Sequence, residues 1–166
     1  NVYFGKKIKT IQPILITGAK AWHLGNKFKN QFKSSFEEQI RKYKRKNQEI
    51  LISFGEIDCR SDEGIINFSN KNRKNYFVVC EKTIIDYINY MEKNLKKYFE
   101  KRYYLGIPAP FPITNENDEL HSKRKKLIKF FNQNLKKETK ERGAYFIDVY
   151  SLTVDENGEN NKLYMC

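Results

Sequence analysis

The feature that most constrains the fold of this chain is an alternation of short apolar runs with long amphipathic stretches. Each apolar run is nearly continuous, as is typical of parallel strands that are covered on both faces. Glycine or proline follows the first three runs, at Gly18, Gly55 and Pro108, and favours a turn at each strand end. We therefore predict four strands, at residues 13–17, 50–54, 103–107 and 144–149.

The stretches between these runs carry a helical pattern. In residues 27–46, 75–101 and 119–142, apolar residues recur at spacings of three and four, which places them on one face of a helix. The last stretch stops at Gly143, a residue type that commonly ends helices. Alternating strands and helices imply right-handed crossovers, so we predict a three-layer α/β/α sandwich with a mostly parallel sheet, in a single domain that covers residues 1–166.

Length and composition exclude several other classes of protein. The 166 residues can bury a sizeable core, and an aromatic content of 14% argues against a mainly disordered chain. No apolar run approaches the roughly 20 residues that a membrane span needs. Neither end resembles a signal peptide, so we expect a cytoplasmic protein.

The cysteines and histidines do not form a recognisable metal or disulfide pattern. Cys59, Cys80 and Cys166 are widely spaced and include no C-x-x-C pair, so we expect free thiols in a reducing compartment. Neither His23 nor His121 lies at ligand spacing from a cysteine, so we expect no zinc site. We also expect no cofactor, because no glycine-rich nucleotide motif is present, and we expect His121 to be solvated.

The formal charge of +12 raises the question of nucleic-acid binding. Residues 27–46 hold eight Lys or Arg against two Glu, and residues 121–142 hold nine against two. Such a surplus can neutralise phosphates, but here it lies on the outer faces of two predicted helices. No RNP-like strand, helix-turn-helix or zinc knuckle accompanies it. We favour a solvated lysine-rich surface, and a basic nucleic-acid-binding domain remains an alternative.

Candidate functional residues follow the predicted strands, because ligands bind at the carboxyl ends of strands in open parallel sheets. Glu56, Asp58 and Arg60 come directly after the second strand. Arg60 can hold Asp58 or Glu56 in a charge-assisted fork, or it can reach a substrate oxygen. An ordinary polar loop closed by a salt bridge would have the same sequence. His23 follows the first strand and either reaches this site or is a partly exposed neighbour of Trp22, and Ser61 is a further candidate substrate contact.

The string Phe54-Gly55-Glu56-Ile57-Asp58-Cys59-Arg60 resembles the third conserved block of SGNH/GDSL-type hydrolases, in the variant that reads G-E-I-D-C-R. Residues 14–19 resemble the second block, and residues 131–135 with 143–150 are similar to the last helix and strand of that family. The resemblance spans most of the chain in the right order, but only the segment Gly55–Arg60 is specific by itself. It implies a flavodoxin-like sandwich that hydrolyses an ester, such as an acylated carbohydrate.

The resemblance also implies roles for individual residues. Gly18 would give a backbone N–H to the oxyanion hole. Combined with the strand-end positions, this predicts Glu56, Asp58 and Arg60 as catalytic residues and Gly18, Gly55 and His23 as substrate contacts. In the family an asparagine side chain is a further oxyanion donor, and here Ile57 stands in its place. That donor is either missing or replaced by another group such as Arg60. A non-catalytic relative that binds a carbohydrate or another polar ligand is therefore an alternative.

The first-block G-D-S of the family has no counterpart in the chain, and its final D-x-x-H does not follow the predicted strand at residues 144–149. In the family these blocks supply the nucleophilic serine and the general-base histidine. We therefore expect a domain interior that lacks its first strand and its C-terminal catalytic block. The expected partner is a small-molecule or glycan ester, and the sequence does not indicate an oligomeric state.

Overall fold

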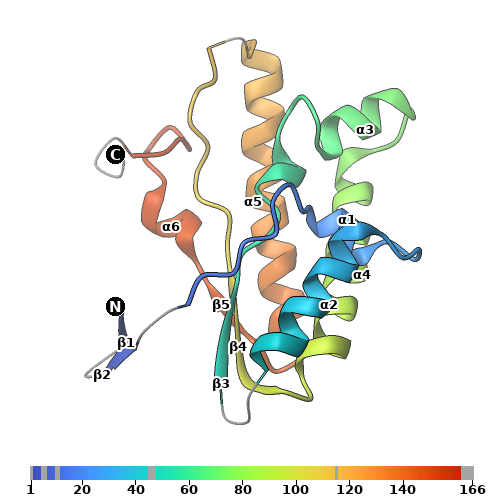
Figure 1. Ribbon diagram of the computed structural model, residues 1–166. Coiled ribbons are helices and arrows are strands. Elements are labelled where there is room, and N and C mark those ends of the chain that lie inside the picture. Colours follow the sequence, from blue (N-terminus) through green and yellow to red (C-terminus); the bar gives the residue numbers. More distant parts are fainter. Residues whose placement is uncertain (1, 5–6, 10–11, 45–47, 115, 162–166) are drawn as a thin grey trace.

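A computed structural model describes residues 2–4, 7–9, 12–44, 48–114 and 116–161. Its main sheet has three parallel strands in the order β3-β4-β5, which confirms an α/β fold with a parallel sheet (Figure 1). These strands are β3 (Gln48–Ile52), β4 (Phe99–Leu105) and β5 (Tyr145–Ile147). They correspond to the second, third and fourth predicted strands, with shifted boundaries. A separate antiparallel pair is formed by β1 (Val2–Phe4) and β2 (Lys7–Lys9).

The three long helices confirm the predicted helical stretches. They are α2 (Gln31–Tyr43), α4 (Tyr76–Leu95) and α5 (Asp118–Glu141). Each begins after an asparagine whose side chain accepts a hydrogen bond from a backbone N–H of the first turn, at Asn30, Asn75 and Asn117. The cap at Asn30 starts α2 later than the pattern predicts, and residues 45–46 of that prediction lie outside the described residues. Residues 99–101, predicted as helix, belong to β4 instead.

Short helices fill the connections. They are α1 (Ala21–Gly25), the 3₁₀ turn η1 (Ile57–Cys59), α3 (Ile65–Lys71) and α6 (Val149–Thr153). All are too short to show a helical period in the sequence. In Figure 1, α2 and α4 lie to the right of the strands and α6 to their left. None of the helices in the described ranges combines the length and the apolar composition that a membrane crossing requires.

The prediction of a strand at residues 13–17 is wrong. Residues 12–16 have no regular secondary structure, and Leu15 is 84% exposed. Pro13 has no N–H to donate to a ladder, and the chain turns where Ala19 N donates to Ile16 O. Gly18 completes this turn at φ +71°. An apolar run therefore marked a connection that leads into α1.

The two faces of the sheet differ in their surroundings. On one face, the buried Arg102 of β4 donates to Glu92 of α4 (Nε to Oε2, 2.9 Å), and Tyr104 donates to the same carboxylate at 2.8 Å. On the other face, Leu51 is 41% exposed, and Tyr145 is 51% exposed. The sheet is therefore fixed to α4 by a buried polar network as well as by apolar contacts.

Candidate functional site

The segment Gly55–Arg60 follows β3 and begins with a turn whose backbone conformation favours glycine. Gly55 has φ +115°, a backbone conformation that other residues rarely adopt. A Cβ at this position would lie 2.5 Å from Cζ of Phe131 and 3.2 Å from Cδ1 of Ile107. The turn thus packs directly against α5, and this close approach positions the residues of η1 that follow.

Asp58 connects this segment to helix α1. Its side chain is buried, with 1% exposure, and its carboxylate accepts hydrogen bonds from Ala21 N (Oδ2, 2.7 Å) and Trp22 N (Oδ1, 3.0 Å). Burial raises the pKa of Asp58, while these two backbone hydrogen bonds act in the opposite direction. Both oxygens have a partner, so Asp58 fixes the first turn of α1 against the end of β3.

Arg60 pairs with glutamates and not with Asp58. Its guanidinium forms a fork with Glu56 (Nε to Oε1, 3.1 Å; Nη2 to Oε2, 3.0 Å) and donates to Glu63 (Nη1 to Oε1, 2.9 Å). All three side chains are more than two-fifths exposed. The cluster therefore closes the loop at the surface, as in the ordinary salt-bridged loop considered above, and its donors are directed at carboxylates.

His23 is held in one tautomer by the backbone of α1. Its Nδ1 accepts a hydrogen bond from Lys20 N at 3.1 Å, so the neutral ring carries its proton on Nε2. Its ring stacks on Phe32 with a centroid distance of 4.1 Å. Burial lowers the pKa of His23, and the charge of Lys20 adds to that shift. At neutral pH His23 is consequently an uncharged N–H donor.

The structure brings some of the predicted residues together and leaves others apart. His23 and Asp58 line one cavity of about 170 Å³. Glu56 and Arg60 do not line this cavity. Arg60 is connected to it through its hydrogen bond to Glu63, which is a lining residue. The remaining lining residues of this cavity are Lys20, Trp22, Gly64, Ile65, Phe68 and Val79. The two glycines have different neighbours, since a Cβ on Gly18 would meet Phe32 at 3.9 Å whereas Gly55 packs on Phe131.

Sequence reasoning did not assign four side chains that line this cavity, namely Lys20, Glu63, Trp22 and Phe68. Lys20 reaches Glu63, with Nζ 3.3 Å from Oε2 and 2.8 Å from the backbone oxygen. The spacing of Arg60 and Glu63 on the polar loop was a usable signal for the glutamate. Nothing in the sequence pairs Trp22 with Phe68, which come from different helices and meet only in the folded chain.

The expectation that His121 is solvated is wrong. Its side chain is 14% exposed and lies between Glu116 (Nδ1 to Oε2, 3.0 Å) and Glu159 (Nε2 to Oε1, 3.0 Å). Glu116 also accepts hydrogen bonds from Arg124, with Nε 3.0 Å from Oε2, and Ser61 contributes to lowering the pKa of Glu116.

The described cysteines agree with the prediction of free thiols. Cys59 and Cys80 are both unpaired and buried, and burial raises the pKa of each thiol. Cys166 lies outside the described residues. Within the described ranges, no group of three His, Cys, Asp or Glu side chains is placed to hold a metal ion.

The cavity beside Asp58 is lined by two half-exposed aromatic rings, by the imidazole of His23 and by Lys20, whose ammonium group is paired with Glu63. Its described lining residues include no serine, threonine or cysteine nucleophile. Comparisons of the chain with family models, with curated proteins and with solved structures find no match.

Proposed function

We propose that this chain is the interior of an SGNH/GDSL-type hydrolase domain that acts on an ester, such as an acylated carbohydrate. The observation that supports this most is the pair of hydrogen bonds from Ala21 N and Trp22 N to Asp58. Through them, the Gly55–Arg60 segment lies against the helix that follows Gly18. These are the two segments whose sequences resemble family blocks. The proposal includes a three-layer arrangement of the complete domain.

In this proposal the chain supplies the oxyanion-stabilising part of the site. Stabilisation of a developing oxyanion by oriented N–H donors is commonly the largest single catalytic contribution. Gly18 would give its backbone N–H, and Nε2–H of His23 would replace the asparagine donor whose position Ile57 occupies. Because the pKa of His23 is lowered by burial, the donor is a neutral imidazole. Arg60 and Glu56 would hold the loop in place.

The experiment is an ester-hydrolysis assay on protein expressed from the complete natural reading frame, since residues 1–166 contain no G-D-S and their one D-x-x-H, Asp118 to His121, opens α5 instead of following β5. Turnover of p-nitrophenyl acetate is expected, and His23→Ala should lower kcat by roughly 10²–10³-fold, as the loss of one oxyanion donor does elsewhere. Phe111→Ala, at an exposed aromatic residue outside the cavity, is the control and should keep full activity. A folded protein that hydrolyses no short acyl ester would overturn the proposal.

A further inference from the structure

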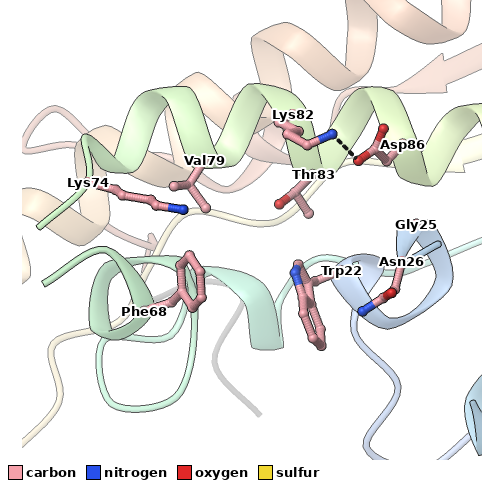
Figure 2. A pocket seen from close by; sticks show the side chains of 9 residues that line it. All are labelled: Trp22, Gly25, Asn26, Phe68, Lys74, Val79, Lys82, Thr83 and Asp86. Carbon is pink, nitrogen blue, oxygen red and sulfur yellow. Dashed lines mark hydrogen bonds and ion pairs between the residues drawn. The ribbon is translucent and has the colours of Figure 1, made fainter. Parts of the chain in front are cut away.

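The cavity beside Asp58 continues into a second one, and together they form a groove between α1, α3 and α4. The second cavity has a volume of about 180 Å³ and shares Trp22, Phe68 and Val79 with the first. It extends along α4 to Thr83 and Asp86 (Figure 2). We call the two cavities together the α1–α4 groove. In Figure 2, α4 forms one wall, while Trp22 and Phe68 project from the other.

Two aromatic rings dominate this groove and remain open to solvent. Trp22 is 45% exposed and Phe68 is 41% exposed. Large apolar side chains that are left exposed within one concave site commonly mark a ligand surface. An indole ring presents a flat, electron-rich face, and the C–H groups on one side of a sugar ring can stack on such a face. The groove is therefore shaped to hold a ring-bearing ligand between the aromatic wall and α4.

The backbone that carries Trp22 is fixed before any ligand arrives. Asp58 accepts a hydrogen bond from Trp22 N at 3.0 Å. At the other end of α1, a Cβ on Gly25 would lie only 2.7 Å from Tyr87 N, so α1 approaches α4 with almost no space between their backbones. A preorganised wall reduces the entropy cost of binding. These backbone contacts distinguish the groove from a chance patch of exposed aromatic residues.

The charges of the groove favour a neutral ligand. Lys82 pairs with Asp86 at 2.7 Å, and Lys20 pairs with Glu63 at 3.3 Å. The carboxylate of Asp86 lines the second cavity and that of Glu63 lines the first. Both would repel a polyanion such as single-stranded RNA. Lys74 adds one ammonium group, 5.6 Å from the ring centroid of Phe68. The net +12 of the chain is thus not concentrated here.

The polar groups of the second cavity match the hydroxyl groups of a sugar. The Asn26 carboxamide oxygen accepts a hydrogen bond from Phe28 N at 3.0 Å, so its NH₂ group is left to act as a donor. Thr83 is directed into the groove, and Asp86 supplies acceptor oxygens (Figure 2). A hydroxyl group both donates and accepts, and this rim offers both kinds of partner.

We propose that the α1–α4 groove binds a neutral carbohydrate, with one sugar ring stacked on Trp22 and its hydroxyl groups hydrogen-bonded to Asn26, Thr83 and Asp86. The statement that this sugar carries the ester rests on the proposed function. The binding itself does not, because no catalytic group is needed for it.

Trp22 is the only tryptophan of the chain, so tryptophan emission, excited at a wavelength that the 11 tyrosines do not absorb, reports on the groove alone. The chain would be titrated with three uncharged probes, namely the linear tetrasaccharides of glucose, mannose and N-acetylglucosamine, up to about 10 mM, beyond the weak end of specific affinity. At least one probe should give a saturable change in emission that is insensitive to salt. Phe68→Ala should weaken this binding about tenfold, in line with the loss of an aromatic contact.

Two further variants keep the test decisive. Thr83→Val removes one hydroxyl group at nearly constant volume and should weaken binding several-fold even if Phe68→Ala fails to fold. Phe111→Ala is the matched aromatic control and should bind like the unaltered chain. No response to any probe, or equal affinities for all variants, would overturn the proposal. So would binding of a single-stranded oligonucleotide alone, with an affinity that falls steeply between about 50 and 200 mM salt.

The two proposals fail in different ways. Saturable sugar binding without ester hydrolysis by the complete protein would refute the proposed function and support a carbohydrate-binding relative. Hydrolysis of p-nitrophenyl acetate without any sugar response would refute the groove proposal and leave the hydrolase proposal standing.

Discussion

The turn at Gly55 permits a quantitative test of how the candidate site is built. In Gly55→Ala, two costs combine. The backbone conformation at φ +115° is unfavourable for alanine, at about 1–3 kcal/mol. The new methyl carbon would also lie 2.5 and 2.7 Å from two ring carbons of Phe131, and overpacking of this kind costs about 1–3 kcal/mol. We therefore expect the free energy of unfolding to fall by roughly 2–6 kcal/mol.

Gly143 provides the matched control. It also has a positive φ, +68°, but a Cβ there would meet nothing within 4 Å. Gly143→Ala should therefore lower the free energy of unfolding only through the unfavourable backbone conformation, by about 1 kcal/mol. The excess of Gly55→Ala over this control combines the clash with Phe131 and the larger backbone cost at φ +115°.

Urea denaturation of a double-mutant cycle isolates that clash. Phe131→Leu replaces the buried ring that faces Gly55 with a smaller side chain. Combined with Gly55→Ala, it should therefore recover part of the lost stability, with a coupling energy of about 1–3 kcal/mol. If the two changes are additive within about 0.5 kcal/mol, the turn does not pack on α5 as described. Equal losses for Gly55→Ala and Gly143→Ala would contradict the reasoning as well.

Three further predictions concern the buried charges. Asp58→Ala leaves the N–H groups of the first turn of α1 without their acceptor, and urea denaturation should show a loss of about 2–5 kcal/mol; a loss below about 0.5 kcal/mol would contradict the capping role. Glu92→Ala leaves the buried Arg102 without its carboxylate partner and should lower the free energy of unfolding by about 3–5 kcal/mol in the same assay. A loss as small as that of an exposed ion pair would show that the pair is solvated. Burial alone would raise the pKa of Glu116, but hydrogen bonds from Arg124 and its other partners outweigh this and lower it. Because the folded-state pKa is lowered, the stabilisation from Glu116 is present above its usual value of 4.5 and is lost as the pH falls through the folded-state pKa. Acid titrations of stability should therefore be flatter for Glu116→Gln than for the unaltered chain, and parallel curves would refute this.

The elements that the sequence predicts well are those with a strong local signal. Helices α4 and α5 combine an apolar stripe with an asparagine cap, so both the pattern and the start are readable. The strands β3, β4 and β5 overlap apolar runs, but the charged first half of β4, Glu100 to Arg102, carries no strand signal. The run at residues 13–17 has the same composition, but an apolar composition does not show whether a neighbouring strand is available to pair with it.

The site was predictable only in part, because its contacts are long-range. The sequence places Glu56, Asp58 and Arg60 at a strand end, and a fork between Arg60 and Glu56 follows from their spacing. The partners of Asp58 are backbone amides of α1, which carry no sequence signature. The aromatic wall of the groove likewise depends on how α1 and α3 pack on α4, and periodicity within either short helix does not reveal it.

The central proposal is that this chain is part of a serine hydrolase, and covalent labelling tests it most directly. A fluorophosphonate probe reacts when an activated serine oxygen attacks phosphorus and fluoride leaves. Protein from the complete natural reading frame should take up one equivalent of probe, at the serine of a G-D-S sequence. A folded protein that takes up no probe, or takes it up only on a serine within residues 1–166, would contradict the claim.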